Sequence, residues 1–514
     1  MAGDLQSKLS DTIGAAAVSD ESSLRSFMAN DVYHGAKTPA LVVRPESVAD
    51  LQAAVRICAA EGQKIVPRGG GASYTDGYLY KAGGHVLFDM SALTAIAVDE
   101  DNAVVTVEAG VTWAALKEQL DKRGLRTPFW GPFSGIAATV GGSLSQNTVS
   151  HGTSAFGVSS ASALSMDVVL ASGELMTTSA SSATRHYGPD LTGLFTGDCG
   201  ALGLKARITL PLIAAREHFV ALSFAFDDFA SYLKADRLAS RAHLDDSRFG
   251  LGKSLSQGQI GKQQSTKARL QIAREIMRSS PGIFAGLKQL SRMAIAGEGA
   301  LVSGEYMCHF IVEGIDPLEA RAKANSLRNI IAPLGREIVN TIPAFVRAMP
   351  FAPLTNTLGP GGERWVPLHG ILPNDKVQPF HDALAKFYGE RKADMERLGI
   401  WQGEMFSPVG SAGFLYEIAL YWPDQKTVYH ETVIDDEYLE TLPEFEANAE
   451  ASKYVDQLKT DLVALYADHG AAHFQIGRAY PYQTALSPEA KALIGGLKAQ
   501  LDPENLMNPG VLGL

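Results

Sequence analysis

The stretch Val66-Pro67-Arg68-Gly69-Gly70-Gly71-Ala72-Ser73-Tyr74 follows an apolar segment and contains three successive glycines. Glycine adopts positive φ at no steric cost and places no side chain above its amide group. Successive N–H groups can therefore converge on an anion, as in the backbone nests that hold phosphates. We interpret the stretch as a loop that binds the pyrophosphate of a dinucleotide, with an ordinary glycine turn as the alternative.

The elements before this loop predict an α/β arrangement. Ala40–Val43 is typical of a strand, and Ser47 and Asp50 form a capping box at the start of a helix that Gly62 ends. The strand Ile65–Val66 then leads into the glycine loop. A strand, helix, strand and loop in this order place a phosphate-binding loop at the carboxyl end of a strand.

A second stretch of small residues, Thr139–Asn147, continues into His151–Gly157. It has little side-chain bulk and many hydroxyl groups, so it could lie flat against a ligand and donate hydrogen bonds. Ser165–Leu170 and Leu175–Thr178 predict a hairpin, and the strand that ends near Pro211 closes the first domain.

The middle of the chain repeats strand–helix–strand units. Met307–Val312, the helix Pro317–Ile331 and Glu337–Val339 form one of them, which predicts an α+β layer with an antiparallel sheet. Residues 250–300, rich in Lys, Arg, Gln and Ser, predict a helical insertion. A further helix is expected over Pro488–Leu501, near the end of the chain.

Composition limits the classes of function. The chain has 514 residues, 46% hydrophobic and 20% charged, with a net charge of -11 that argues against nucleic acid and anionic membranes as partners. Its three cysteines are too few for a disulfide framework or a cysteine-based zinc site, and no metal site is expected. No segment predicts a membrane span or a signal peptide, so we expect a soluble cytoplasmic protein.

Five motifs, taken together and in order, resemble the flavoproteins of the vanillyl-alcohol oxidase and p-cresol methylhydroxylase family. They are Pro67-Arg68-Gly69-Gly70-Gly71, Thr139-Val140-Gly141-Gly142, Tyr187-Gly188-Pro189-Asp190-Leu191-Thr192-Gly193-Leu194-Phe195, Gly203-Leu204 and Asp502-Pro503-Glu504-Asn505-Leu506-Met507-Asn508-Pro509-Gly510. The resemblance implies an α+β fold: a p-cresol-methylhydroxylase-type FAD-binding domain of two α/β subdomains, and an α+β cap domain over an antiparallel sheet.

The same resemblance implies four parts of the chain. They are an N-terminal leader (1–35), the FAD-binding domain (36–214), a substrate-binding cap domain (215–443) and a C-terminal segment that returns to the FAD domain (444–514). It also implies the residues that hold FAD. These are Arg68, Gly69, Gly70, Gly71, Ala72 and Ser73 at the pyrophosphate, Ser134, Thr139, Gly141, Gly142, Asn147, His151 and Gly152 along the ribityl chain and ring, Gly203 and Leu204 near the adenine, and Asn505 and Asn508 from the tail.

Departures from the family bear on how the flavin is attached. Ala72 stands where members with flavin linked through this loop carry histidine, which excludes that link. Leu415 and Tyr416 stand where a cap strand of the family ends in two histidines. We therefore expect non-covalent FAD, with a tyrosyl link through Tyr416 as the alternative.

Other departures leave the substrate class open. Phe474 and Gln475 occupy the positions of the Tyr-Arg pair that clamps phenolates, and Ala138 stands where phenol oxidases carry an acid beside the flavin. The stretch from Tyr187 to Leu204 is more similar to the 2-hydroxy-acid dehydrogenases of the same fold. Their paired metal-binding cap histidines are not found in this sequence.

Flavin oxidation needs a base or a charge stabiliser beside the hydride acceptor. The candidate catalytic residues are Tyr74, His369, Tyr416, Glu417, Arg478 and Tyr480. Each could instead be a packed or hydrogen-bonded structural residue, since Tyr416 lies on an apolar face of its strand with Phe414 and Ile418. Arg478 could clamp a carboxylate or phenolate, or form a surface ion pair.

These features predict an FAD-dependent oxidoreductase that oxidises a phenolic or lignin-type aromatic alcohol or an alkylphenol by hydride transfer to the flavin. Its partners would be a small-molecule substrate and an electron acceptor, either oxygen or a carrier protein, and a homodimer is left open. The first alternative is an FAD-dependent D-2-hydroxy-acid dehydrogenase. The second is a non-catalytic flavin-binding subunit.

Overall fold

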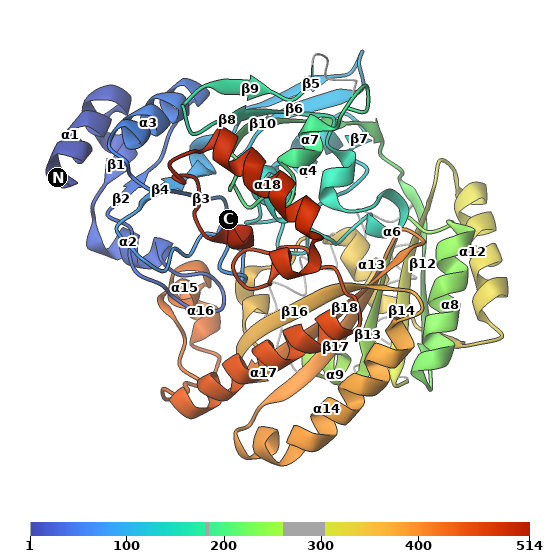
Figure 1. Cartoon of the computed structure of the whole chain (residues 1–514). Helices are drawn as coiled ribbons and strands as arrows, with labels where there is room; N and C mark the ends of the chain where they lie inside the picture. The colour runs from blue at the N-terminus through green and yellow to red at the C-terminus, as the bar shows by residue number, and fades with distance from the viewer. Residues whose placement is uncertain (1, 180–184, 261–303) are drawn as a thin grey trace.

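The computed structural model describes residues 2–179, 185–260 and 304–514. Figure 1 shows a first domain, with strands β1 to β10, lying over a cap domain that carries β12 to β18. Most of the insertion expected over residues 250–300 lies outside the described residues. Among those that are described, no helix combines the length and apolar character needed to cross a membrane.

The first sheet of the first domain carries the glycine loop. Its strand order is β1 (Val18–Ser19), β2 (Leu41–Val43), β4 (Val86–Asp89) and β3 (Ile65–Arg68), with β2, β4 and β3 parallel. Helix α3 (Val48–Ala60) begins where its capping box predicts, because the Ser47 side chain accepts from the Asp50 amide. Helix α1 (Ala2–Ile13) packs against α3 through Leu5 and Leu9.

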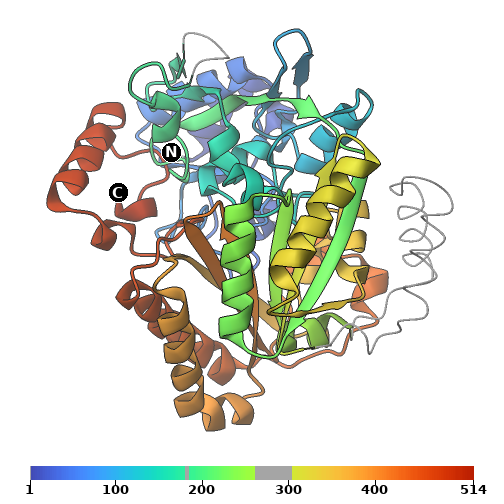
Figure 2. The same cartoon turned by 90° about the vertical axis from the view of Figure 1, so that its right-hand side faces the viewer.

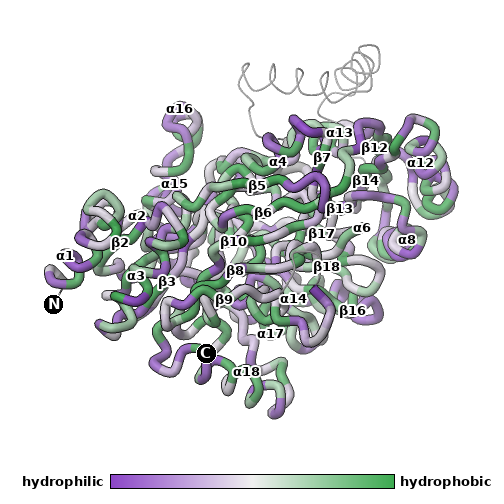
Figure 3. Tube along the Cα trace, turned by 90° about the horizontal axis from the view of Figure 1, so that it is seen from above, coloured by the Kyte–Doolittle hydropathy of each residue, from purple (hydrophilic) through white to green (hydrophobic). Residues whose placement is uncertain are grey.

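The second sheet is antiparallel and has five strands. Their order is β5 (Ile96–Asp99), β6 (Val104–Glu108), β10 (Leu204–Pro211), β8 (Ser165–Val169) and β9 (Leu175–Thr177). Helices α4 (Trp113–Asp121) and α5 (Val140–Gln146) share its core, and Figure 3 shows hydrophobic residues through the middle of the molecule where these strands lie. The small-residue stretch expected to lie flat against a ligand is largely helical, because it forms α5. Thr139 caps this helix by accepting a hydrogen bond from the Gly142 amide.

The cap domain is built on a seven-stranded antiparallel sheet. The strand order is β15 (Arg336–Ile338), β12 (His218–Phe226), β14 (Tyr306–Gly314), β13 (Ser247–Gly252), β17 (Trp401–Val409), β18 (Gly413–Trp422) and β16 (Arg364–Pro373). Four helices pack into the core on one face, namely α8 (Phe229–Ala242), α12 (Pro317–Ile331), α14 (Val377–Arg397) and α17 (Ala449–Asp468). Figure 2 shows α8 and α12 side by side over the sheet. The expected α+β fold is confirmed.

The other face of the cap sheet meets the first domain. Side chains alternate along a strand, so Tyr416 joins the helix-covered core while its neighbour Leu415 packs with Val149 and Phe474. Tyr421, six residues further along the same face of the strand, packs in a cluster with Trp130 of the first domain. We call this side of the sheet the inner face.

The tail returns to the glycine-loop strand after helix α18 (Pro488–Leu501). The Ile65 amide donates to the Leu506 carbonyl at 2.8 Å, and the Asn508 amide donates to the Ile65 carbonyl at 2.7 Å. Asp502 accepts from the Leu506 and Met507 amides, at 2.8 Å each. A parallel bridge between Ile65 and Met507 thus joins the tail to β3, four residues before the glycines begin.

Candidate active site

A hollow of about 900 Å³, counted with its open mouth, lies against the glycine loop. Eleven of the residues expected to hold FAD line it, namely Gly69, Gly70, Gly71, Ala72, Ser73, Ser134, Thr139, Gly141, Gly142, Gly203 and Leu204. The expected residues that do not line it are Arg68, Asn147, His151, Gly152, Asn505 and Asn508. Two segments far apart in sequence, residues 67–78 and 132–148, therefore form most of one wall.

The glycine loop offers unpaired donors to this hollow. The amides of Gly69, Gly70, Gly71 and Ala72 donate no hydrogen bond to any described residue. A methyl group on Gly70 would collide with the carbonyl oxygen of Ala137, and one on Gly69 would lie 2.6 Å from the Thr139 hydroxyl. Free amides on a backbone with no room for side chains fit a phosphate group that approaches closely.

Arg68 supports the loop from behind instead of facing the hollow. Its guanidinium lies 4.9 Å from the Phe27 ring centroid and 5.2 Å from that of Tyr78. Gly71 has a φ of 70°, and a side chain there would collide with this guanidinium. Arg68 therefore holds the backbone of the loop through packing and cation–π contact.

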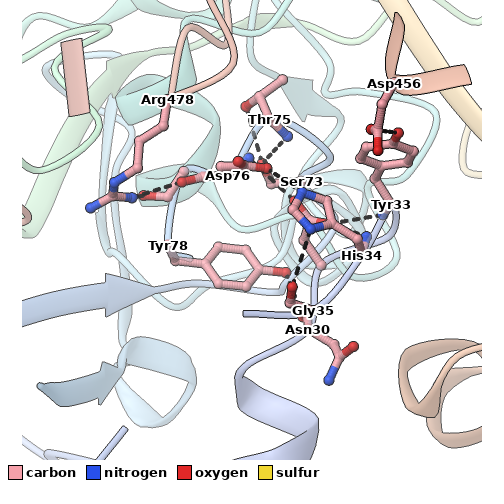
Figure 4. A network of polar contacts seen from close by, with 12 residues as sticks. Asn30, Tyr33, His34, Gly35, Ser73, Thr75, Asp76, Tyr78, Asp456 and Arg478 are labelled. Atoms are coloured by element: carbon pink, nitrogen blue, oxygen red, sulfur yellow. Dashed lines mark hydrogen bonds and ion pairs between the residues drawn. The ribbon is translucent and has the colours of Figure 1, made fainter. Parts of the chain in front are cut away.

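A polar network holds the end of the loop, as Figure 4 shows. Asp76 accepts from the His34 ring at 2.8 Å, while its backbone carbonyl accepts from the Arg478 guanidinium at 2.7 Å. The second guanidinium nitrogen of Arg478 donates to the Asn508 side chain and the Pro509 carbonyl, both at 2.8 Å. Arg478 is thus a structural clasp between loop and tail, and both of its terminal guanidinium nitrogens donate to the protein.

The segment before β2 takes part in the same network. The buried Asp31 carboxylate accepts from the amides of Tyr33, His34 and Asp76, at 2.8, 2.9 and 3.2 Å. Tyr78 donates to the carbonyl of Gly71 at 2.9 Å. Burial raises the pKa of Asp31 to about 6. These contacts of the N-terminal segment with the loop were not anticipated, because no local pattern marks a residue whose partners lie 45 positions away.

Three further residues expected to contact FAD, all asparagines, instead fix the conformation of the backbone around the hollow. Asn147 ends α5 in a left-handed conformation with φ 54° and accepts from the Ser160 hydroxyl. The Asn508 side chain donates to the carbonyls of Gly77 at 2.8 Å and Cys199 at 2.6 Å. Asn505 is also left-handed, with φ 48°, and its carbonyl accepts from Lys64. They shape the loops around the hollow without lining it.

Several residues that line the hollow were not among the expected cofactor contacts. They include Tyr78, Gln146, Thr148, Cys199, Lys205 and Gln475. Lys205 is buried and paired with Asp198. A charged residue within an otherwise apolar strand is unusual, and this pattern could have identified Lys205 from the sequence. No group of three His, Cys, Asp or Glu side chains that could hold a metal occurs among the described residues.

Four of the six candidate catalytic residues meet beside Gln475. The Tyr74 ring lies 5.9 Å from the His369 ring, and the His369 ring lies 5.4 Å from that of Tyr480, measured between centroids. Glu417 is the direct cross-strand partner of His369 on the inner face. A loop of the first domain, the C-terminal segment and two strands of the cap therefore converge on one polar cluster.

Burial sets the protonation states in this cluster. It raises the pKa of Glu417 to about 7 and lowers the pKa of His369 to about 3. The Glu417 carboxylate has no hydrogen-bond or ion-pair partner among the described residues, and its side chain is only partly covered. Tyr480 accepts from the His369 amide at 3.1 Å. A neutral imidazole therefore lies beside a carboxyl group that titrates near neutral pH.

The structure does not bring Tyr416 and Arg478 into this cluster. The Tyr416 hydroxyl lies 2.8 Å from His381 on the helix-covered side of the cap sheet, and Tyr416 is fully buried there. Its direction follows from the alternation that puts Leu415 and Glu417 on the inner face. Arg478 lies in the clasp described above.

A second, smaller hollow lies between the two domains, and its enclosed space of about 20 Å³ has room for little more than a water molecule. It is lined by Phe133, Val149, Ser150 and His151 of the first domain and by Ser247, Arg248, Phe249, Met405, Ser407 and Leu415 of the cap. Phe133 and Val149 directly adjoin Ser134 and Thr148, which line the large hollow. The two spaces are therefore neighbours.

The comparisons with known proteins agree with the site. Residues 39–179 match the family model described as FAD binding domain. This match covers the glycine loop, α5 and most of the wall of the large hollow. This part of the chain is therefore an FAD-binding domain, and the free amides and glycine cradle of the hollow fit that cofactor.

Relatives in sequence are oxidases and dehydrogenases. The chain is 28% identical over 205 residues to glycolate oxidase subunit GlcD of Bacillus subtilis, covering 40% of this chain and 43% of that protein. It is 30% identical over 192 residues to the mitochondrial cytochrome-type D-lactate dehydrogenase of Arabidopsis thaliana, covering 37% and 33%. The matches thus span less than half the length of these curated relatives.

Solved structures share the whole fold. p-Cresol methylhydroxylase with bound substrate has a TM-score of 0.72 at 17% identity, covering 100% of this chain and 96% of that one. The isoeugenol complex of 4-ethylphenol oxidase from Gulosibacter chungangensis has a TM-score of 0.67 at 16% identity, covering 99% and 97%. In fold, and in its FAD-binding domain, the chain groups with FAD-linked oxidases and dehydrogenases.

Replacing Gly70 tests whether the cradle holds the cofactor. Gly70→Ala adds a methyl group against the Ala137 carbonyl, so we expect FAD affinity to fall at least about tenfold. The flavin-to-protein absorbance ratio after gel filtration, with FAD titration, measures this. Gly496→Ala in α18 is the matched control because nothing lies within 4 Å of its added methyl. Full FAD retention by Gly70→Ala would contradict the assignment.

Proposed function

We propose that this protein is an FAD-dependent oxidoreductase that oxidises a phenolic or aromatic alcohol or alkylphenol, with oxygen or a carrier protein taking the electrons. The observation that carries the proposal is Glu417, an unpartnered carboxyl group on the inner face of the cap. It lies near Tyr74, whose partner Gln475 lines the flavin hollow. When bound, FAD supplies the hydride acceptor.

Glu417 is suited to hold the proton that leaves the substrate hydroxyl. A general base works best when its pKa lies near the working pH, and burial raises the pKa of Glu417 to about 7. His369 opposite it is neutral, so it does not neutralise the carboxylate. Tyr74 and Trp365, whose rings lie 5.6 Å apart, provide an apolar edge against which an aromatic ring can pack.

The charges around the site favour a substrate without a carboxylate. The cations that line either space are Lys205, paired with Asp198, and Arg248, paired with Asp236 and Asp245. Arg478, the residue that would have bound a carboxylate, is engaged in the clasp. Burying an anion without a partner costs several kcal/mol.

A D-2-hydroxy-acid dehydrogenase is the second candidate, because several relatives in sequence carry the name D-lactate dehydrogenase. The matched part covers 37% and 38% of this chain, which is too short to include both domains. A non-catalytic flavin-binding subunit would show the same similarity, so the similarity does not separate these functions.

We also propose that the FAD is not covalently attached. Ala72 carries no nucleophile, and the Tyr416 hydroxyl lies on the far side of the cap sheet with His381. Acid precipitation of the loaded protein should therefore leave the flavin in the supernatant. Yellow colour that stays with the precipitate, and is lost in Tyr416→Phe, would reverse this assignment.

A substrate panel separates the candidate functions. Under anaerobic conditions, vanillyl alcohol, 4-hydroxybenzyl alcohol or 4-ethylphenol should bleach the flavin absorbance, whereas D-lactate, D-2-hydroxyglutarate and glycolate should not. The reason is that, among the described residues, no unpaired cation lines either space. Bleaching by the hydroxy acids alone would favour the dehydrogenase. Bleaching by none of the compounds, with FAD bound, would favour the non-catalytic subunit.

Replacing Glu417 tests its role as base. The rate of flavin reduction should rise as the pH passes through about 7, because the carboxylate must be ionised to accept a proton. Glu417→Gln should lower the rate about 100-fold or more and remove this pH dependence. Glu404→Gln is the matched control. Burial also raises the pKa of Glu404 to about 7, but Glu404 lies on the helix-covered face of the sheet, because its neighbour Met405 lies on the inner face. An unchanged profile in Glu417→Gln would refute the role.

A further inference from the structure

Lys205 is a buried lysine in the wall of the large hollow. It is the second residue of β10, is 4% exposed, and lines the hollow together with Gly203 and Leu204. Its Nζ atom donates to the carboxylate of Asp198, which is 2% exposed. A lysine is seldom buried unless it is paired, and this one meets that condition. The pairing alone does not explain why the ammonium group lies against the cofactor hollow.

The ammonium group of Lys205 has donors to spare. A lysine carries three N–H donors, and Asp198 is the one partner of this Nζ atom among the described residues. Lys498, the other buried lysine in the described part of the chain, donates to the Asp502 carboxylate at 2.6 Å and to two backbone carbonyls at 2.8 Å each. Lys498 does not line the hollow. Buried donors are ordinarily paired, so the unused donors of Lys205 indicate a ligand that accepts from them.

Asp198 fixes the position of this ammonium group. One carboxylate oxygen accepts from Lys205 and from the Gly200 amide, the latter at 3.1 Å, and the other accepts from a second amide of the same loop at 3.4 Å. The amides of Gly197 and Cys199, on either side, donate to carbonyls of α5 at 2.9 and 3.0 Å. Asp198 itself does not line the hollow. It therefore holds Lys205 from behind and neutralises its charge.

Lys205 lies on the part of the wall that is away from the cap. Gln475 lines the hollow and hydrogen-bonds with Tyr74, which belongs to the polar cluster beside the cap strands. Met90 and Leu204 also line the hollow, but they pack in a core cluster that contains no residue of the cap. Lys205 directly follows Leu204. The hollow therefore has one side near the cap and another side deep in the first domain.

The order of groups in FAD assigns a part of the cofactor to each side. Its pyrophosphate lies in the middle, with the flavin on one side and adenosine on the other. The free amides from Gly69 to Ala72 fit the pyrophosphate, and the proposed function puts the flavin ring toward the cap. The adenosine half then extends to Met90, Leu204 and Lys205. Two apolar side chains and one polar group are a typical lining for such a ligand.

We propose that Lys205 recognises the adenosine half of FAD, by donating from Nζ to a ring nitrogen of adenine or an oxygen of the ribose, while Asp198 holds it in place. This inference rests on the proposed function for the direction of the cofactor and adds how the cofactor is chosen. Lys205 favours the dinucleotide over FMN, which has no adenosine. Because the Lys205–Asp198 pair is neutral, this side of the hollow accepts an uncharged base without burying a net charge.

Titration calorimetry of the full-length apoprotein with FAD, FMN and ADP tests the assignment. Lys205→Met should lower the affinities for FAD and for ADP about tenfold each and leave the affinity for FMN unchanged. Lys117→Met in α4 is the control, since it also removes a lysine paired with an aspartate, but one that is partly exposed. An equal loss for FMN would place Lys205 at a phosphate, and no loss for any ligand would make the pair purely structural. Either result would overturn the proposal.

Two further variants keep the test independent of folding. Lys205→Met leaves Asp198 buried without a counter-charge, whereas Lys205→Met combined with Asp198→Asn removes both charges. The double variant should show the same losses for FAD and ADP. Asp198→Asn alone keeps the Lys205 donors, so the preference for FAD over FMN should persist. A preference that survives the double variant in full would overturn the proposal.

The outcomes also separate this inference from the proposed function. Selective losses of FAD and ADP affinity in Lys205→Met, without flavin bleaching of the native protein by any compound, would support the Lys205 assignment and refute the oxidase function. Bleaching by aromatic alcohols in a protein whose preference for FAD does not depend on Lys205 would support the function and refute the assignment.

Discussion

The clasp between the C-terminal tail and the glycine loop is the contact on which the site depends. Asn508 and Arg478 donate to the backbone carbonyls of Gly77 and Asp76, at 2.8 and 2.7 Å. Buried donors and acceptors that lose their partners cost about 1–3 kcal/mol each, so loop and tail stabilise one another. The loop can then leave its own amides unpaired, because its shape is fixed by side chains that grip its carbonyls and not by sheet pairing.

The cap sheet imposes the second constraint. A one-residue shift in register would exchange the two faces of β18 and replace Glu417 with Tyr416. Ten consecutive cross-strand pairs between β16 and β18, from Arg364 with Trp422 to Pro373 with Gly413, hold this register. The core on the helix-covered side, where the Phe380 and Tyr466 rings stack with centroids 4.5 Å apart, accommodates the apolar residues of β18 and not Glu417. Packing on one face therefore decides which chemistry the other face presents.

Local signals were sufficient for much of the fold. Helices α12 and α18 begin and end as expected, since each has a capping residue followed by proline. The glycine loop was found because close backbone approach requires a distinctive composition. The helical state of Val140–Gln146 was missed, because glycine and serine have low helix propensity and only tertiary packing makes α5 helical.

Alternation along β18 separated Tyr416 from Glu417, but it did not tell which face of the strand meets the first domain. His151, expected at the cofactor, lines the smaller space, and no local pattern gives its contact with the Pro350 carbonyl.

The electrostatics of the two spaces follow one rule, which links the site to its substrate. The cofactor hollow meets negative charge with backbone amides, while the cations in the linings of both spaces are neutralised by carboxylates. The smaller hollow is lined by His151, whose pKa is lowered to about 4 by burial. Glu417 is then the group in this part of the site whose charge changes near neutral pH, because burial alone raises its pKa to about 7. A neutral ligand is therefore the kind that such a site can bury without a further counter-charge.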